Sequence, residues 1–222
     1  MKQAAAGWWL PDNDTHFAGL GDLILYQQVA FDAALRRVPK ARRQLAVDVG
    51  AHVGTWTVRL ARLFDEVVAI EADPSNHDCL RRNLADRQIG NVELVRAAAG
   101  AVEGVGHVRR VCPTNSGDCA VDPGPGDGTA PAVGIVRLDD LLAPRPAVDF
   151  LKLDLQGGEL SALQGAQATL ARHQPVVICE FWKDLGPDPD VLALMAAHGL
   201  HPVERIRGDL IYAPTGGKKE AA

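Results

Sequence analysis

Short apolar runs alternate with amphipathic stretches through the middle of the chain. The runs QLAVDVG, EVVAIEA, NVELVRAAAG, VDFLKLDL and PVVICEF have the length and composition of buried strands. Apolar residues recur at helical spacing over residues 56–64 and 160–170, between these strands. The alternation predicts an α/β fold with a mostly parallel sheet and helices on both faces. PVERI and DLIYAP have no helix between them, so we expect an antiparallel C-terminal edge strand.

The segments around this alternation predict the domain organisation. Residues 1–43 precede it and are expected to form an N-terminal helical cap on the substrate side of one α/β domain over residues 44–214, with a disordered tail at 215–222. The Pro/Gly-rich stretch 122–131 predicts a surface loop or lid. The Trp8–Trp9 pair is expected to be exposed, which makes a homodimer interface possible.

Composition narrows the functional classes. The net charge of −5 gives no reason to expect nucleic-acid binding. No secretory signal is recognisable and no run approaches the roughly 20 apolar residues of a membrane span, so we expect a cytoplasmic protein. The cysteines have no metal-binding spacing, and no metal site is expected. Cys112 and Cys119 could pair across their loop, although free thiols are favoured.

The stretch DVGAHVG ends the first predicted strand of the sheet and marks a candidate ligand site. Ligands of such sheets bind at the carboxyl ends of the strands. Gly50 permits a sharp turn and Gly54 a close approach to a ligand or strand, while the Asp48 carboxylate would repel a pyrophosphate and favour a cation. Glu71, which ends the second strand, is placed to accept the hydroxyls of a ribose. These residues fit S-adenosylmethionine (SAM), a ribose-bearing cation, better than the dinucleotide of a dehydrogenase.

Four motifs together resemble the FkbM family of SAM-dependent methyltransferases. They are D-x-G-A-x-x-G at residues 48–54, E-x-x-P at 71–74, L-D-x-L at 138–141, and K-x-D followed by Gly and Glu at 152–159. The stretch TNSGD at 114–118 is also similar to the family's Asn-Ser-Gly segment. The chain departs from the family pattern at His52, where Asn is usual, and at Gln156, where Glu is usual. The resemblance implies a class I methyltransferase-like Rossmann sheet, with SAM as cofactor and S-adenosylhomocysteine as product.

The resemblance and the strand ends together assign roles to individual residues. Asp154, at the end of the fourth strand, is the expected base, and Lys152 lies on its face as a second catalytic candidate or a buried charge partner. Glu159 is expected to be structural, and Asp139 to cap the helix DDLLA. The expected cofactor residues are Asp48, Gly50, Ala51, His52, Gly54, Thr55, Glu71, Ala72, Ala97 and Ala98. Asn115, Ser116, Glu180 and Trp182 are expected around the substrate.

These assignments favour a SAM-dependent O-methyltransferase. The expected methyl acceptor is a hydroxyl of a small natural product or sugar, because the deprotonation of an alcohol requires a positioned base. The alternative is a non-catalytic SAM- or nucleotide-binding module that regulates or binds a partner. This alternative is motivated by Gln156, because the acidic side chain that the family usually has at this position is lost.

Overall fold

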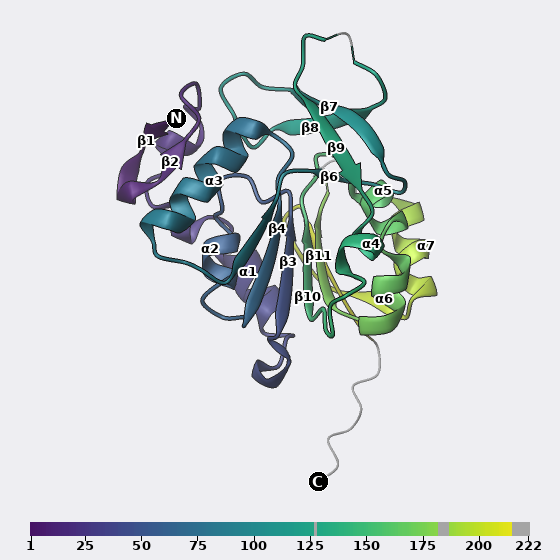
Figure 1. The fold of residues 1–222 in the computed structure, drawn as a ribbon. Helices are drawn as coiled ribbons and strands as arrows, with labels where there is room; N and C mark the ends of the chain where they lie inside the picture. The colour runs from purple at the N-terminus through teal and green to yellow at the C-terminus, as the bar shows by residue number, and fades with distance from the viewer. Residues whose placement is uncertain (127, 182–186, 215–222) are drawn as a thin grey trace.

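The computed structural model describes residues 1–126, 128–181 and 187–214. A sheet of seven strands runs through the centre, in the order β12-β13-β11-β10-β3-β4-β5 (Figure 1). Its strands are β3 (Leu45–Val49), β4 (Glu66–Ile70), β5 (Val92–Val95), β10 (Phe150–Leu153), β11 (Val176–Glu180), β12 (Leu200–Ile206) and β13 (Asp209–Pro214). The pairs from β11 through β5 are parallel, whereas β13 is antiparallel to both β11 and β12. The predicted parallel sheet and its antiparallel C-terminal hairpin are therefore confirmed, with β13 inserted between β11 and the edge strand β12.

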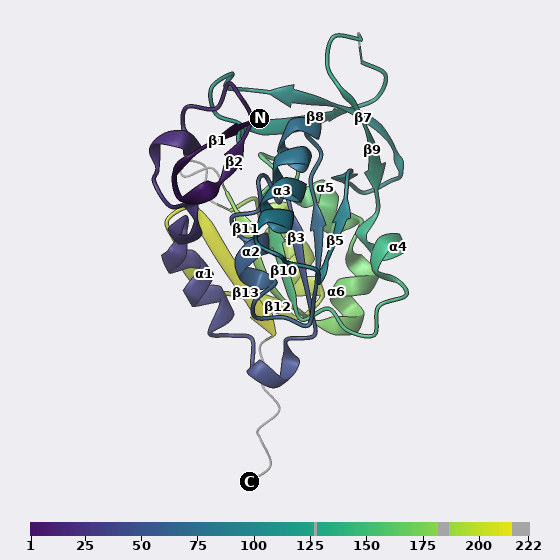
Figure 2. The same ribbon diagram turned by 60° about the vertical axis from the view of Figure 1, so that its left-hand side comes forward.

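Helices cover both faces of this sheet (Figures 1 and 2). One face carries α1 (Gln28–Leu35), α2 (Thr57–Leu60) and α3 (Pro74–Asp86); the other carries α4 (Leu138–Leu142), α5 (Glu159–Gln164), α6 (Gln167–His173) and α7 (Pro189–Ala197). In the described part of the chain, no helix has the length and apolar character needed to cross a bilayer.

The alternation of side chains along each strand distributes the core between the two faces. Val47, Val49 and Leu153 pack with the helices α4–α7, whereas Ala46 and Phe150 pack against α1 and the segment around α2. Both faces of a parallel strand are buried, which explains why these runs are continuously apolar in the sequence. The long helix expected over 160–170 is divided into α5 and α6 at Gly165, where a Cβ atom would lie 2.1 Å from the Gly100 carbonyl oxygen.

A second, smaller sheet lies over the C-terminal ends of the central strands (Figure 1). Its order is β6-β9-β7-β8, with β6 (Ala98–Ala99), β7 (Gly104–Arg110), β8 (Cys119–Pro123) and β9 (Ala132–Val136). Most of the Pro/Gly-rich stretch forms the connection from β8 to β9.

The N-terminal segment differs from the predicted helical cap. It contains one α-helix, α1. Before α1 lie the two-stranded sheet of β1 (Lys2–Gln3) and β2 (Trp9–Leu10) and the 3₁₀ turns η1 (Ala5–Gly7), η2 (Phe17–Gly19) and η3 (Leu23–Leu25). A further 3₁₀ turn, η4 (Lys40–Arg42), follows α1. The expectation of an exposed tryptophan pair is wrong: Trp8 is 1% exposed and packs with Leu80 and Leu84 of α3. The indole nitrogens of Trp8 and Trp9 donate to Asp22 and Asp86. The possibility of a homodimer interface at this pair therefore loses its basis.

Asp139 does not cap its own helix, contrary to the prediction. Its carboxylate accepts the backbone N–H groups of Ala168 and Thr169, at 3.0 and 2.8 Å, and so caps the first turn of α6. Pro74 lies in the first turn of α3, where the Asp73 carboxylate accepts the backbone N–H groups of Ser75 and Asn76.

Gly50 lies directly after β3, at a position where only glycine fits. Its φ is +74°, and a Cβ atom there would lie 1.9 Å from the carbonyl oxygen of Asp154. The backbone N–H groups of Gly50 and Ala51 both donate to the Ile70 carbonyl at 3.0 Å. The ends of β3, β4 and β10 are therefore held against one another through the backbone.

We expect Gly50→Ala to lower the free energy of unfolding by more than the cost of placing alanine in a left-handed backbone conformation. Gly21 is the matched control, since its φ is +76° and no atom lies within 4 Å of the added Cβ. Gly21→Ala should cost about 1 kcal/mol for the backbone conformation, and Gly50→Ala about 1–3 kcal/mol more for the displaced Asp154 loop. Urea unfolding of both variants measures the difference, and equal losses would contradict the close approach.

Candidate active site

A cavity of about 880 Å³ opens at the carboxyl ends of β3, β4, β10 and β11. This position includes the topological switch point, where the sheet continues from β3 through β4 in one direction and through β10 in the other. The volume lies near the upper end of the ~300–1,000 Å³ typical of ligand sites, so it can hold more than one small molecule. The second sheet and the N-terminal segment complete its walls through residues that include Phe17, Tyr26 and Asp122.

The cavity brings together most of the residues predicted for the site. It is lined by Gly50, Ala51, His52, Thr55, Glu71, Ala72, Ala97, Ala98, Asn115, Ser116, Lys152, Asp154 and Glu180. Trp182 lies outside the described residues. Asp48 and Gly54 do not line the cavity: an added Cβ on Gly54 would lie 2.6 Å from Leu80, which identifies this glycine as a contact between the turn and α3.

The buried charge of Asp48 is compensated within the protein, which corrects its predicted role as a negative charge facing a cation. Asp48 is 0% exposed; its Oδ1 lies 3.3 Å from Nζ of Lys152, and its Oδ2 accepts the Thr57 hydroxyl at 2.6 Å. The acidic groups that do line the cavity near the strand ends are Glu71, Asp154 and Glu180.

Lys152 is a permanent cation beneath the site. Its Nζ donates to the Gly50 carbonyl at 2.6 Å and lies 3.7 Å from Oδ2 of Asp154. Burial alone would lower the pKa of Lys152, but the carboxylates of Asp48 and Asp154 raise it above its ordinary value. Of the two roles considered for Lys152, this geometry favours the charge partner, because a lysine that stays protonated cannot act as a base.

The Asp154 carboxylate has the environment of an ionised group despite its burial. Burial raises its pKa, but Lys152 and hydrogen bonds from Glu180 and Gln156 bring the pKa of Asp154 below its ordinary value. The Gln156 Nε2 donates to Oδ1 of Asp154 at 3.0 Å. Gln156, which stands where the family usually has Glu, therefore supplies a hydrogen-bond donor that an ionised glutamate would lack.

Glu71 is held by the backbone of two loops at the end of β4. Its Oε2 accepts the N–H of His52 at 2.7 Å and its Oε1 accepts the N–H of Asp73 at 2.8 Å. Burial raises the pKa of Glu71 to about 7, against these hydrogen bonds, which lower it. Each carboxylate oxygen retains acceptor capacity for a further donor, as a ribose would supply.

His52 departs from the family pattern without straining the turn. Its φ is +52°, in the left-handed region where both Asn and His are enriched. Its ring lies against Phe17, with 4.5 Å between the ring centroids, and burial lowers the pKa of His52 to about 4. The imidazole is therefore neutral at physiological pH.

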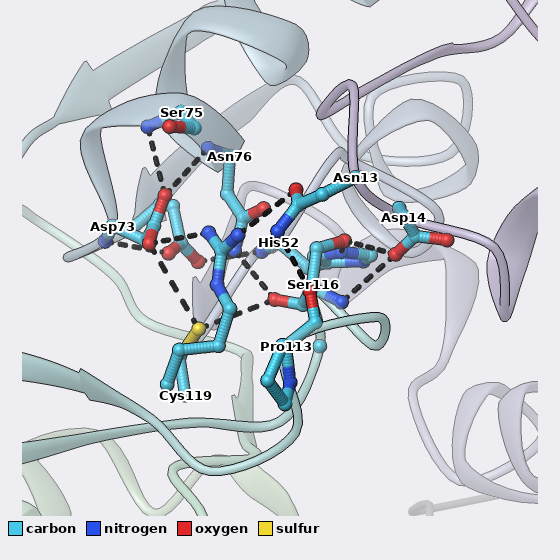
Figure 3. Close-up of polar contacts among 12 residues, drawn as sticks. Asn13, Asp14, His52, Asp73, Ser75, Asn76, Pro113, Ser116 and Cys119 are labelled. Atoms are coloured by element: carbon cyan, nitrogen blue, oxygen red, sulfur yellow. Dashed lines mark hydrogen bonds and ion pairs between the residues drawn. The ribbon is translucent and has the colours of Figure 1, made fainter.

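The loop between β7 and β8 is fastened to the site through Ser116, a contact that the sequence did not predict. The Ser116 hydroxyl donates to Oδ2 of Asp14 at 2.5 Å and lies 2.7 Å from Nε2 of His52 (Figure 3). Since an ionised Asp14 can only accept, the Ser116 oxygen is the acceptor for His52, whose Nε2 carries the proton. We call Asp14, Ser116 and His52 the loop latch.

Further contacts reinforce the loop latch on both sides. The Asn76 side chain donates to the Ser116 carbonyl at 2.8 Å, and the N–H groups of Thr15 and His16 donate to the Thr114 carbonyl. The Arg110 guanidinium pairs with Asp73 at 2.7 Å. The Oδ1 of Asn115 accepts the N–H of Gly117 at 3.1 Å, as in an Asn/Ser/Gly turn, and its place beside the substrate stays a prediction.

Glu159 organises the loop that follows β10. Its two carboxylate oxygens accept the backbone N–H groups of Leu155 and Gly157, at 2.7 and 3.1 Å. This geometry agrees with the structural role expected for it.

All four cysteines, including Cys112 and Cys119, are free thiols.

Comparison with known proteins identifies the family. The sequence profile of the Methyltransferase FkbM domain matches residues 48–201. The chain belongs to the FkbM methyltransferase family. It is therefore a SAM-dependent methyltransferase, and the resemblance carried by the K-x-D run and the glycine turn is confirmed.

Solved structures share the fold at low sequence identity. A methyltransferase FkbM from Methylobacillus flagellatus KT is 23% identical with a TM-score of 0.49, over 77% of this chain; the chain spans only 43% of the length of that protein. Precorrin 8w decarboxylase from Methanobacterium thermoautotrophicum is 16% identical, with a TM-score of 0.52 over 93% of this chain and all of the other. A ribosomal protein L11 methylase from Lactobacillus delbrueckii subsp. bulgaricus is 15% identical, with a TM-score of 0.50 over 86% and 78% of the two chains. Among functionally curated proteins, no relative of the chain was found.

We expect Ser116→Ala to release the loop between β7 and β8. The substitution leaves Nε2 of His52 without its acceptor and removes one of the donors to Asp14, at a cost of about 1–2 kcal/mol. Hydrogen exchange should accelerate over residues 112–118 while the strands of the central sheet keep their protection. Ser75→Ala, at an exposed serine in the first turn of α3, is the control. Unchanged exchange over 112–118 would show that the loop does not depend on the latch.

Proposed function

We propose that this FkbM-family methyltransferase transfers a methyl group to a hydroxyl of a small natural product or sugar. The observation that carries the proposal is the Asp154 carboxylate, partly exposed to the cavity and kept ionised beside Lys152. An alcohol is a poor nucleophile at neutral pH, and a positioned base increases its reactivity by about 10²–10⁴-fold. A carboxylate with a low pKa suits this role when it acts on a hydroxyl whose proton is lost only as the new bond forms.

The residues around the cavity fit SAM. Glu71, with two backbone donors holding its carboxylate, would accept the ribose hydroxyls, and the turn from Gly50 to His52 would pack against the cofactor. Ala97 and Ala98, which are 5% and 8% exposed, leave room for a flat base beside β6. When bound, SAM supplies an electrophilic methyl group on a sulfonium. The cationic donor is compatible with the acidic side chains Glu71, Asp154 and Glu180 of the lining.

The chain's own contribution would be to orient the acceptor, exclude water and accept a proton. Tyr26, Glu180 and Phe181 line the cavity together with Asp154, and they would form the acceptor side. The N-terminal segment and the loop latch would shield this space from solvent. The segment 1–43 accordingly serves as a substrate-side cap in this proposal, and residues 44–214 as the cofactor-binding domain.

The alternative of a non-catalytic module has less support. It was based on Gln156, which lacks the family's acidic side chain. The Gln156 amide donates to Asp154, the proposed base, at 3.0 Å, so this substitution is compatible with catalysis. The proposed partners are a small hydroxyl-bearing molecule and no nucleic acid, in keeping with the net charge of −5. We also propose a cytoplasmic location, on the ground that reduced thiols are typical of that compartment and all four cysteines are free.

Transfer of a labelled methyl group tests the proposal. SAM with a labelled methyl is incubated with the protein and a panel of alcohols, sugars and phenols, alongside matched carboxylates and amines. We expect label in an ether product, located by mass spectrometry, and calorimetric binding of both SAM and S-adenosylhomocysteine. Label found only on carboxylates or amines would contradict O-methylation of a hydroxyl, and the absence of SAM binding at millimolar concentration would contradict the cofactor assignment.

A further inference from the structure

Two proposed site residues, Asp154 directly after β10 and Glu180 at the end of β11, lie in neighbouring positions at the carboxyl edge of the sheet. In the parallel pair β10/β11, Leu153 lies opposite Cys179, so the next residue of each strand occupies the same row at the strand ends. The carboxyl groups of Asp154 and Glu180 both line the cavity, and each shifts the pKa of the other, that of Asp154 downward and that of Glu180 upward. A hydrogen bond between two carboxyl groups requires a proton, because ionised carboxylates are acceptors only.

The surroundings decide which of the two carboxyl groups holds this proton. Asp154 receives the Gln156 amide at 3.0 Å and has the Lys152 ammonium 3.7 Å away, and both contacts favour its ionised form. Glu180 lies between Asp154 and Asp209, since β11 pairs with β13 in the register Glu180↔Asp209. Burial and then the negative charge of Asp154 raise the pKa of Glu180, whereas Lys152 helps to lower that of Asp154.

We propose that Glu180 is a positioning residue that carries the shared proton and donates it in a hydrogen bond to Asp154, which leaves Asp154 as the proton acceptor of the reaction. This inference rests on the proposed O-methyltransferase function. The hydrogen bond orients the Asp154 carboxylate and keeps a second negative charge away from it. Glu180 thereby has a defined role beyond that of a wall of the acceptor site.

The proton balance of a turnover follows from this arrangement. The acceptor oxygen bonds the methyl carbon, the electron pair of the broken carbon–sulfur bond stays on sulfur, and the hydroxyl proton passes to Asp154. The pair then holds two protons, and one is released to water before the next turnover. Among the residues that the structure describes, the ionisable groups around the pair are Lys152 on β10, His52 after β3, Tyr26 in the N-terminal segment, Glu159 on α5 and Asp209 on β13.

The titration of the two side chains tests the shared proton without any substrate. In the wild-type protein with ¹³C-labelled aspartate and glutamate, we expect the Glu180 carboxyl to titrate well above the ordinary range of glutamate and Asp154 below that of aspartate. In Asp154→Asn, the titration of Glu180 should move down, because the neighbouring charge is gone. A Glu180 that titrates in the ordinary range in the wild type would overturn the inference.

Three substitutions separate the positioning role from the base. Asp154→Asn should lower kcat/KM by about 10²–10⁴-fold, because an amide cannot take the proton. Glu180→Gln keeps a donor toward Asp154 and should stay within about tenfold of wild type, whereas Glu180→Ala should lose roughly 10- to 100-fold. Activity is measured with the best acceptor of the labelled-methyl panel, and exposed Glu103→Gln is the control.

The pH profile adds a readout that a purely structural role would not move. The wild type should lose activity at alkaline pH as Glu180 gives up its proton, and Glu180→Gln should lack this alkaline decline. A Glu180→Gln variant as inactive as Asp154→Asn, or one that keeps the wild-type decline, would overturn the inference. If the titration holds but no hydroxyl acceptor is methylated, the proposed O-methylation fails while the shared proton stands.

Discussion

The buried ammonium of Lys152 holds together the parts of the site that come from different strands. It neutralises Asp48 on β3, donates to the Gly50 carbonyl where β3 ends, and lies beside Asp154 where β10 ends. A buried carboxylate without a partner would be costly, so Asp48 and Lys152 require each other. The glycine turn below the proposed cofactor site and the proposed base are therefore positioned by the same charge.

Because Lys152 compensates the charge of Asp48, the loop after β3 does not select the ligand by its charge. Asp48 has its charge compensated and does not line the cavity, whereas Glu71, Asp154 and Glu180 do. A cationic donor would thus meet negative charge from the ends of β4 and β10, next to the protonated Glu180 at the end of β11. Only part of that charge is expressed, since burial favours the protonated form of Glu71 and Glu180.

Much of this architecture could be read from the sequence because parallel strands are buried on both faces and carry their ligand residues at one end. Glu71 and Asp154 follow apolar runs and Lys152 lies within one, and all three line the cavity. Contacts between distant segments have no such signal. Asp14 and Ser116 are 102 positions apart, and neither the burial of Trp8 nor the use of Asp139 to cap α6 follows from local periodicity. Neighbouring residues alone also could not show that Lys152 cancels the charge of Asp48.

A double-mutant cycle on Asp48 and Lys152 tests the central claim most directly. Asp48→Asn, Lys152→Met and the double variant are compared with wild type by urea unfolding. Each single change should cost about 3–5 kcal/mol, because it leaves a buried charge without its partner. The double variant should be less destabilised than the sum of the two, by about 1–3 kcal/mol. Strictly additive losses would show that the two residues act independently and would contradict the account.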